Sequence, residues 1–181
     1  MTSATAIANE IARRVTHLLL ETRKWSDTVA AEALGDVSQM RILEIGSGRQ
    51  DLGIDAYSLK AQFAGAAEFV QSDVNPAFGH RVVDVTDMSI DQEFDAILCQ
   101  YVLEHVFDVQ AAVDNIRKAL RPGGKVVISV PHIYPYHDEP SDFWRFTEYS
   151  LRALCRDFSS VEVRRKGIRR WPKALLVVAT R

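Results

Sequence analysis

The sequence predicts an α/β fold, a doubly wound, mostly parallel seven-stranded sheet with an antiparallel last strand and helices on both faces. Between residues 41 and 157, short apolar segments alternate with helical ones, which implies right-handed crossovers between parallel strands. The last two extended segments, 160–165 and 174–180, are joined by a loop too short for a helical crossover, so they should pair antiparallel. With 181 residues and 47% hydrophobic content, the chain is long enough for one domain, 1–181.

Helical periodicity marks the segment before the first strand. Residues 4–34 predict one or two helices whose apolar stripe covers one face of the sheet, and a partner-binding helix is the alternative. The stripe recurs at steps of three and four residues, at Ile7, Ile11, Val15, Leu18, Leu19 and Trp25. Trp25 is also a candidate for lining a substrate pocket.

Residues 41–48, Arg-Ile-Leu-Glu-Ile-Gly-Ser-Gly, predict a buried strand that enters a tight turn. Gly46 and Gly48 lack the Cβ atoms that would hinder a sharp turn and the close approach of a ligand. A strand that ends in this glycine turn favours the binding of a nucleotide-like ligand. A plain turn is the alternative, because Arg49 and Gln50 follow and the third glycine of a dinucleotide fingerprint is absent.

Acidic residues end the next two predicted strands. A helix over 52–63 precedes a strand over 68–71, and Asp73 follows at the strand tip, where its carboxylate can accept from ribose hydroxyls. A turn-capping role is the alternative for Asp73. A third strand, 81–83, ends at Asp84, which is placed to receive an adenine amino group.

Residues 94–157 continue the alternation of predicted strands and helices. A buried strand over 94–99 leaves through Gln100 towards a helix, which should stop at the Arg-Pro-Gly-Gly run of 121–124. That helix carries its apolar face at Val113, Ile116 and Leu120. A fifth strand covers 125–130, and a helix lies around 147–157. The carboxyl ends of parallel strands share one edge of the sheet, so the glycine turn, the strand-end acids and Gln100 should meet there.

Charge, cysteine content and apolar runs indicate which partners and which cellular compartment to expect. A net charge of −2 and a pI near 6.2 provide no field that gathers nucleic acid. The basic run over 164–173 is either a docking patch for phosphate or RNA or simply a solvated face. Cys99 and Cys155 are expected to be reduced, packed thiols. No membrane-span-length apolar run and no secretory signal are visible, so we expect a cytoplasmic location.

An ordered set of motifs resembles the class I, seven-stranded S-adenosylmethionine-dependent methyltransferase family. The motifs are Leu-Glu-Ile-Gly-Ser-Gly, Ser-Asp-Val, Val-Asp-Val-Thr-Asp-Met, Phe-Asp-Ala-Ile-Leu-Cys-Gln-Tyr-Val-Leu-Glu-His-Val and Leu-Arg-Pro-Gly-Gly-Lys-Val. The resemblance implies S-adenosyl-L-methionine as cofactor. The cofactor-binding residues that it implies are Glu44, Gly46, Ser47 and Gly48 for the methionine moiety, Asp73 for the ribose, Asp84 and Val85 for the adenine, and Gln100 on the floor.

The sequence departs from the family pattern in three places. Arg49 and Gln50 stand where many members have glycine or a small residue. The link from Asp73 to Arg81 has no room for the usual helix, and no inserted domain covers the mouth of the site. These departures favour a large or partner-presented substrate, or a domain that binds the cofactor without turnover.

The segment 131–147, Pro-His-Ile-Tyr-Pro-Tyr-His-Asp-Glu-Pro-Ser-Asp-Phe-Trp-Arg-Phe-Thr, must cross the carboxyl edge of the sheet. It resembles a subgroup of bacterial methyltransferases, some linked to surface glycan or lipid synthesis. His137 is the leading candidate for a catalytic base, because the ordinary pKa of histidine lies near working pH. The other candidates are His132 and Tyr134 for catalysis, and Tyr136, Asp142, Trp144 and Arg145 for substrate binding.

Structural roles compete with these assignments. His137 would then tie the loop to Asp142, and Arg145 would pair with Asp138 or Asp142. His105 is expected to fix the start of its helix. A metal site from His132, His137 and Asp138 matches no strong ligand spacing, so no metal is expected.

The predicted function is methyl transfer to a small or medium acceptor, which includes glycan-linked and lipid-linked ones. Oxygen is favoured over nitrogen because the loop offers a base. Methylation of RNA or of a protein side chain, with docking on the basic run, is the rival enzyme hypothesis, although nucleic acid is disfavoured by charge. A non-catalytic cofactor-binding scaffold or subunit is the rival from another class, and an oligomer is compatible with all three.

Overall fold

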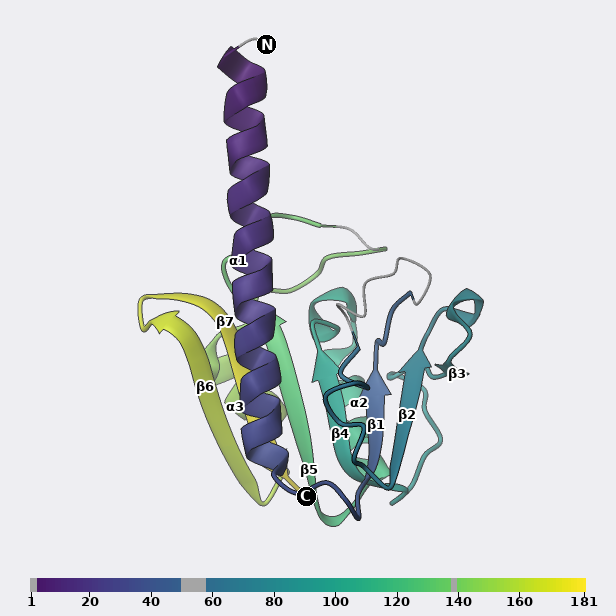
Figure 1. Cartoon of the computed structure of the whole chain (residues 1–181). Helices are drawn as coiled ribbons and strands as arrows, with labels where there is room; N and C mark the ends of the chain where they lie inside the picture. Colours follow the sequence, from purple (N-terminus) through teal and green to yellow (C-terminus); the bar gives the residue numbers. More distant parts are fainter. Residues whose placement is uncertain (1–2, 50–57, 138–139) are drawn as a thin grey trace.

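A seven-stranded sheet in the order β3-β2-β1-β4-β5-β7-β6 forms the centre of the computed structural model, which describes residues 3–49, 58–137 and 140–181 (Figure 1). The strands are β1 (Arg41–Ile45), β2 (Glu68–Asp73), β3 (Arg81–Val82), β4 (Phe94–Gln100), β5 (Leu120–Pro131), β6 (Ser160–Ile168) and β7 (Trp171–Thr180). The first five are parallel, and β7 runs antiparallel to both β5 and β6. The predicted fold class and the antiparallel last strand are confirmed.

Helical elements cover both faces of this sheet. They are α1 (Ser3–Leu34), η1 (Pro76–Phe78), η2 (Leu103–His105), α2 (Val109–Ala119) and α3 (Glu148–Leu154). One apolar cluster joins Leu43 and Ile97 to Ile116 of α2 and Leu151 of α3. A second cluster packs α1 on the opposite face. The alternation of side chains along each strand supplies both faces at once, because successive residues point to opposite sides.

A single long helix, α1, forms over the segment 4–34, for which one or two helices were predicted. Its C-terminal part packs on the sheet through Val29, Ala30 and Leu34, beside Ile42 and Leu98. Its N-terminal part extends beyond the carboxyl edge of the sheet (Figure 1). The assignment of residues 1–181 to one domain stays a prediction. No helix in the described part of the chain combines the length and the apolar character needed to cross a lipid bilayer.

Two predicted helices differ from the structure. Of the helix expected over 52–63, residues 52–57 lie outside the described residues, and the described remainder is irregular at 58–59 and forms a turn from residue 60, with no helix. The helix expected to reach Leu120 ends at Ala119, because Leu120 pairs with Phe94 as the first residue of β5. The Arg-Pro-Gly-Gly run is therefore part of this strand rather than a separate stop signal. Between β2 and β3 a single 3-10 turn, η1, replaces a helix, as expected from the short link.

The β6–β7 hairpin is longer than predicted. The two strands continue to Ile168 and Trp171, so Arg169 and Arg170 alone form the turn in place of a loop over 166–173. Gly167 permits this extension, because its φ is +100° and a Cβ there would lie 2.9 Å from the carbonyl oxygen of Trp171.

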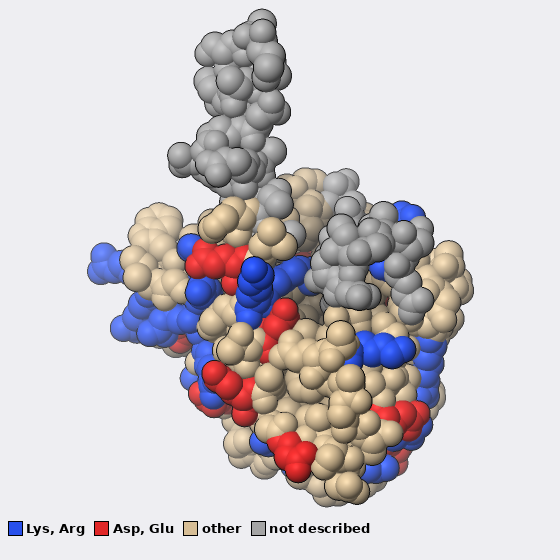
Figure 2. All heavy atoms as spheres, viewed as in Figure 1, with Lys and Arg blue, Asp and Glu red and all other residues tan. Residues whose placement is uncertain are grey.

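Lys and Arg side chains gather on the face of the molecule that carries this hairpin (Figure 2). Acidic partners hold several of them: Arg164 pairs with Glu162 and Glu32, Arg165 with Glu148, and both Lys166 and Lys173 with Glu21 of α1. Most of the basic run is thus neutralised locally, which fits the interpretation as a solvated face. The ion pairs of Glu21 also fasten α1 to the hairpin.

Candidate active site

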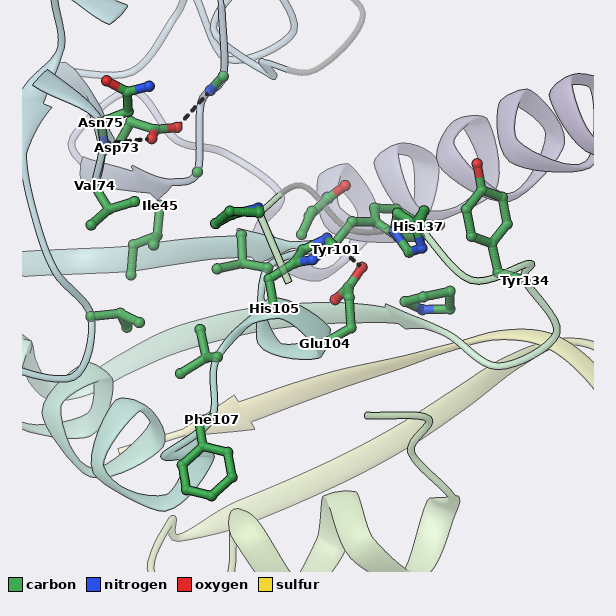
Figure 3. Close-up of a pocket in the computed structure, with 18 of the residues that line it drawn as sticks. Ile45, Asp73, Val74, Asn75, Tyr101, Glu104, His105, Phe107, Tyr134 and His137 are labelled. Carbon is green, nitrogen blue, oxygen red and sulfur yellow. Dashed lines mark hydrogen bonds and ion pairs between the residues drawn. The ribbon is translucent and has the colours of Figure 1, made fainter. Parts of the chain in front are cut away.

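A cavity of about 990 Å³ opens at the carboxyl ends of β1, β2, β4 and β5 (Figure 3). It lies where the strand order reverses, because β1 has β2 on one side and β4 on the other. Gly46, Asp73 and Asp84 line one end, and Glu104 and His137 line the other. We call these the nucleotide end and the loop end of the cavity. The predicted convergence of strand ends is confirmed by this arrangement.

The turn after β1 is held tightly at the nucleotide end. Gly46 and Gly48 have φ values of +75° and +70°, which favour glycine. The amide groups of Gly46 and Ser47 both donate to the carbonyl oxygen of Ser72 over 2.9 Å. A Cβ on Gly46 would lie only 2.5 Å from Cγ2 of Val102, so this position leaves no room for a side chain.

Two strand-end carboxylates face the same end of the cavity. Asp73 accepts the amide hydrogens of Gly48 and Asn75, each over 3.0 Å and each on a different oxygen. Asp84 is exposed and accepts from the amide and hydroxyl groups of Thr86 at 2.8 and 2.7 Å. Both carboxylates and Val85 line the cavity. Each oxygen of Asp73 keeps acceptor capacity for a ligand hydroxyl.

Glu44 and Ser47 take a different place from the other residues predicted for the cofactor. The buried carboxylate of Glu44 accepts from the hydroxyl groups of Ser47 and Ser58 at 2.7 and 2.6 Å, and from the amide of Leu59 at 2.6 Å. Neither Glu44 nor Ser47 is among the described residues that line the cavity. They fasten the loop that follows β1, and their contact with the methionine moiety stays a prediction.

The end of β4 presents polar groups to the middle of the cavity. Gln100 accepts from the hydroxyl of Ser26 over 3.3 Å, and its buried Nε2 has no hydrogen-bond partner among the described residues. Tyr101 follows with φ at +55°, and the guanidinium of Arg23 lies 4.6 Å from the centre of its ring. Strained backbone of this kind recurs where a functional side chain must be aimed. The Nε2 group of Gln100 is thus a donor without a partner among the described residues, and it lies at the strand end where Gln100 was predicted to meet the cofactor.

Glu104 is the most unusual side chain at the loop end. It is fully buried, and neither carboxylate oxygen has a hydrogen-bond partner among the described residues. Burial raises its pKa to about 8, because the charged form is desolvated. Sequence reasoning missed Glu104. Its position one residue before His105 in Leu-Glu-His was the available signal, and only the fold shows the burial.

His105 faces Glu104 with its Nε2, which lies 3.9 Å from Oε1 (Figure 3). Its Nδ1 donates to the carbonyl oxygen of Ser141. The prediction that His105 fixes the start of the following helix is wrong, because Asp108 caps α2 and accepts from the amide of Ala111 over 3.0 Å.

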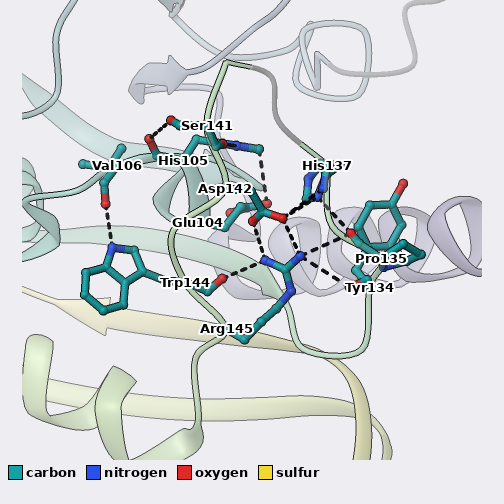
Figure 4. Close-up of polar contacts among 10 residues, drawn as sticks. All are labelled: Glu104, His105, Val106, Tyr134, Pro135, His137, Ser141, Asp142, Trp144 and Arg145. Atoms are coloured by element: carbon teal, nitrogen blue, oxygen red, sulfur yellow. Dashed lines mark hydrogen bonds and ion pairs between the residues drawn. The ribbon is translucent and has the colours of Figure 1, made fainter.

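A network around Asp142 joins the two described parts of the segment 131–147, residues 131–137 and 140–147, at the cavity (Figure 4). Arg145 donates to both oxygens of Asp142 and to the carbonyl oxygens of Tyr134 and Pro135. The guanidinium holds the pKa of Asp142 far below its ordinary range. Asp142 in turn accepts the amide hydrogen of His137 over 3.0 Å, and its Oδ2 lies 3.3 Å from Nδ1 of that ring. Arg145 and Asp142 thus position His137.

His137 completes the loop end. Its ring makes edge contacts with Tyr134 and His105, at centroid distances of 4.6 and 4.9 Å. Burial lowers the pKa of His137 and so favours the neutral ring, whereas the charge of Asp142 acts in the opposite direction. Of the three predicted catalytic candidates, His137 and Tyr134 line the cavity.

The remaining predicted residues lie elsewhere. His132 uses Nδ1 to donate to the carbonyl oxygen of Phe146 over 2.7 Å, and Trp144 donates to Val106 over 2.9 Å. Tyr136 is 75% exposed. Among the described residues, the lining of the cavity does not include His132, Tyr136, Asp142, Trp144 or Arg145. Asp138, the third member of the conceivable metal set, lies outside the described residues.

Similarity to known proteins agrees with this geometry. A family model described as a methyltransferase domain matches residues 13–165. A ubiquinone biosynthesis O-methyltransferase of Bradyrhizobium sp. (strain ORS 278) is 32% identical over 108 residues, which are 55% of this chain and 43% of that protein. The match therefore spans less than half the length of this curated relative.

Solved structures show the same fold. An S-adenosylmethionine-dependent methyltransferase from Mesorhizobium loti has a TM-score of 0.66 at 20% identity, over 85% of this chain and 96% of that one. A 1,6-didemethyltoxoflavin-N1-methyltransferase from Burkholderia thailandensis, with bound 1,6-didemethyltoxoflavin and S-adenosylhomocysteine, has a TM-score of 0.64 at 20% identity, over 98% of this chain and 85% of that one. The chain belongs to the methyltransferase-domain family and has the fold of the class I, S-adenosylmethionine-dependent methyltransferases.

Proposed function

We propose that this protein transfers a methyl group from S-adenosyl-L-methionine to a hydroxyl group of a small acceptor, held at the loop end of the cavity. The observation that carries the proposal is the buried carboxyl group of Glu104, which lies beside His105 and His137 and has no hydrogen-bond partner in the described part of the chain. A buried polar group without a partner is uncommon in native proteins, so its place in the lining of the cavity supports a role in ligand binding or catalysis. The volume of about 990 Å³ is at the upper end for small-molecule sites, which suits a cofactor and an acceptor together.

The nucleotide end fits the cofactor. Gly46 and Gly48 line this end together with Asp73, and the buried Nε2 of Gln100 has no hydrogen-bond partner among the described residues. Asp73 would hold the ribose hydroxyls, and Asp84 and Val85 would meet the adenine. When bound, S-adenosyl-L-methionine supplies a methyl group on a positively charged sulfur. The protein has then only to align the acceptor and remove its proton.

The loop end can take that proton. Nδ1 of His137 faces the carbonyl oxygen of Pro135 and Oδ2 of Asp142, both at 3.3 Å, which leaves Nε2 with its lone pair for the cavity. We assign the uptake of the acceptor proton to this atom, with Tyr134 packed against the ring to keep its orientation. A small acceptor, rather than RNA or a protein side chain, agrees with the local neutralisation of the basic run.

Calorimetric titration with S-adenosyl-L-methionine and S-adenosylhomocysteine, with NADH as the control ligand, tests the cofactor. Binding of the first pair alone is expected. The methyl transfer is then tested with radiolabelled cofactor and a panel of phenols and catechols, compared with a matched panel of amines. Transfer to amines alone would overturn the choice of oxygen. Cofactor binding without transfer to any acceptor would favour the non-catalytic scaffold.

A further inference from the structure

We propose that Glu104, His105 and His137 bind a divalent first-row transition metal ion at the loop end of the cavity. Each residue offers one ligand atom, and these three atoms lie within 4.8 Å of one another. They come from two segments that are far apart in the sequence: η2 with its end at His105, and the loop after β5 (Figure 3). The site differs from the set considered from sequence spacing, because only His137 is common to both.

Glu104 provides the evidence for a missing ligand. Its side chain is 0% exposed, lines the cavity, and has two oxygens without hydrogen-bond partners among the described residues. A buried carboxyl group normally accepts hydrogen bonds or pairs with a cation, since a buried polar group without a partner costs free energy. A metal ion bound through one of these oxygens meets this need directly.

The two imidazole rings are oriented as ligands. His105 donates through Nδ1 to the carbonyl oxygen of Ser141, so Nε2 carries the lone pair and points to Glu104 at 3.9 Å. Nδ1 of His137 lies 3.3 Å from both Asp142 and the carbonyl oxygen of Pro135. Metal-binding histidines characteristically donate their second N–H to a carboxylate or a backbone carbonyl, which fixes the tautomer.

Arg145 holds the carboxylate that faces His137. It donates to both oxygens of Asp142, one of them over 2.7 Å (Figure 4). The side chain of Asp142 is only 1% exposed. The chain of contacts from Arg145 through Asp142 to His137 thus keeps the ring in place.

The donor set indicates the class of metal. Two imidazole nitrogens and one carboxylate oxygen suit Mn²⁺, Fe²⁺, Co²⁺ or Zn²⁺ and leave coordination positions open to the cavity. Mg²⁺ and Ca²⁺ prefer oxygen ligands throughout. The proposal therefore predicts selectivity for transition metals over Mg²⁺.

This inference rests on the proposed function in one respect, the role of the ion. An acceptor hydroxyl at an open position would lose its proton more readily, because a bound cation stabilises the oxygen anion. The proton then passes to water, the acceptor oxygen forms the new bond to the methyl carbon, and the electron pair of the broken carbon–sulfur bond stays on sulfur. His137 acts as a ligand in that case, and as the direct proton acceptor only in a metal-free site.

The test measures metal binding without activity. Chelator-stripped protein is titrated with Co²⁺, which is followed by its visible absorption, and the titration is repeated with Mg²⁺ in excess. We expect one Co²⁺ site per chain that Mg²⁺ does not displace. Binding should weaken at least tenfold in Glu104→Gln and in His137→Ala, and should be unchanged in His17→Ala, which removes an exposed histidine of α1.

Circular dichroism of each variant controls for folding, and Glu104→Gln keeps the side-chain volume. Unchanged Co²⁺ affinity in folded Glu104→Gln and His137→Ala would overturn the site. A parallel titration of the same protein with S-adenosyl-L-methionine separates the two proposals. Cofactor binding without a Co²⁺ site overturns the metal ion and leaves the function, whereas a Co²⁺ site without cofactor binding supports the metal ion and removes the function.

Discussion

The amide of Gly48 donates to Oδ2 of Asp73 over 3.0 Å and so joins the turn after β1 to the end of β2. Asp73 also accepts the amide hydrogen of Asn75 on its other oxygen. The carboxylate is 8% exposed and borders the cavity. One side chain therefore shapes the glycine turn and presents acceptor oxygens to a ligand.

Replacement of Asp73 by alanine should weaken the binding of S-adenosyl-L-methionine by about 10- to 100-fold, because hydrogen bonds to a charged group contribute roughly 1.5–3 kcal/mol. Calorimetric titration measures the dissociation constant. The matched control is Asp157→Ala, which removes a carboxylate that is 56% exposed. Equal affinity in Asp73→Ala and the control would show that Asp73 does not hold the ribose.

Substitution of Gly46 by alanine should destabilise the protein by about 2–5 kcal/mol. The φ of +75° costs a residue with a Cβ roughly 1–2 kcal/mol, and the 2.5 Å contact with Val102 adds overpacking of about 1–3 kcal/mol. Gly35→Ala is the control, since Gly35 has a φ of +65° and a Cβ added there would meet nothing within 4 Å, so this variant should show the backbone cost alone. Urea unfolding measures the free energy of unfolding of both variants.

The double variant Gly46→Ala with Val102→Ala separates the two costs. It should lose less stability than the sum of its single changes, because the shortened side chain removes the contact. Strict additivity would mean that Val102 is not the source of the strain.

The strand ends of the site could be predicted from sequence, because each of them directly follows an apolar run. Gly46, Asp73, Asp84 and Gln100 all appear at the cavity for this reason. The register of a parallel sheet brings them to one edge without any information on side-chain packing.

The loop end could not be predicted in the same way. His137 meets His105 only after the loop folds back, and Ser141 and Asp142 set that fold through hydrogen bonds with no periodic pattern. Glu104 stands in a Leu-Glu-His sequence that does not by itself show burial, and its significance depends on that burial. The sequence therefore left Asp142 open between substrate binding and a structural role, and the structure shows the structural contacts, with His137 and Arg145.

Loss of the His137 ring should lower turnover with little effect on cofactor affinity. The ring lies at the loop end, away from the glycine turn, and either proposed role places it at the acceptor. His137→Ala is expected to reduce kcat by about 10²- to 10⁴-fold, which is the usual contribution of acid–base catalysis. Single-turnover transfer at saturating cofactor measures it, with His17→Ala as the matched control. Full turnover in the variant would exclude both roles.

Asp27, which is not among the described residues that line the cavity, gives a pH dependence of stability. Burial raises its pKa from the ordinary value of 3.8 to about 6, with a further contribution from the charge of Glu44. The folded state then binds a proton more tightly than the unfolded state. Ionisation of this carboxyl group therefore destabilises the folded state. Its contribution to the free energy of unfolding decreases as pH rises from about 4 to about 6.

Asp27→Asn should remove that loss and leave the variant more stable than the natural chain at pH 7, by about 1 kcal/mol after allowance for solvent screening. Urea unfolding at pH 4, 5, 6 and 7 measures the difference between the two proteins. Asp36→Asn is the control of opposite sign, because hydrogen bonds from Ser38 lower the pKa of Asp36, and its ionised form therefore favours the fold. A difference between Asp27→Asn and the natural chain that stays constant from pH 4 to pH 7 would show that the Asp27 carboxyl has an ordinary pKa in the folded protein.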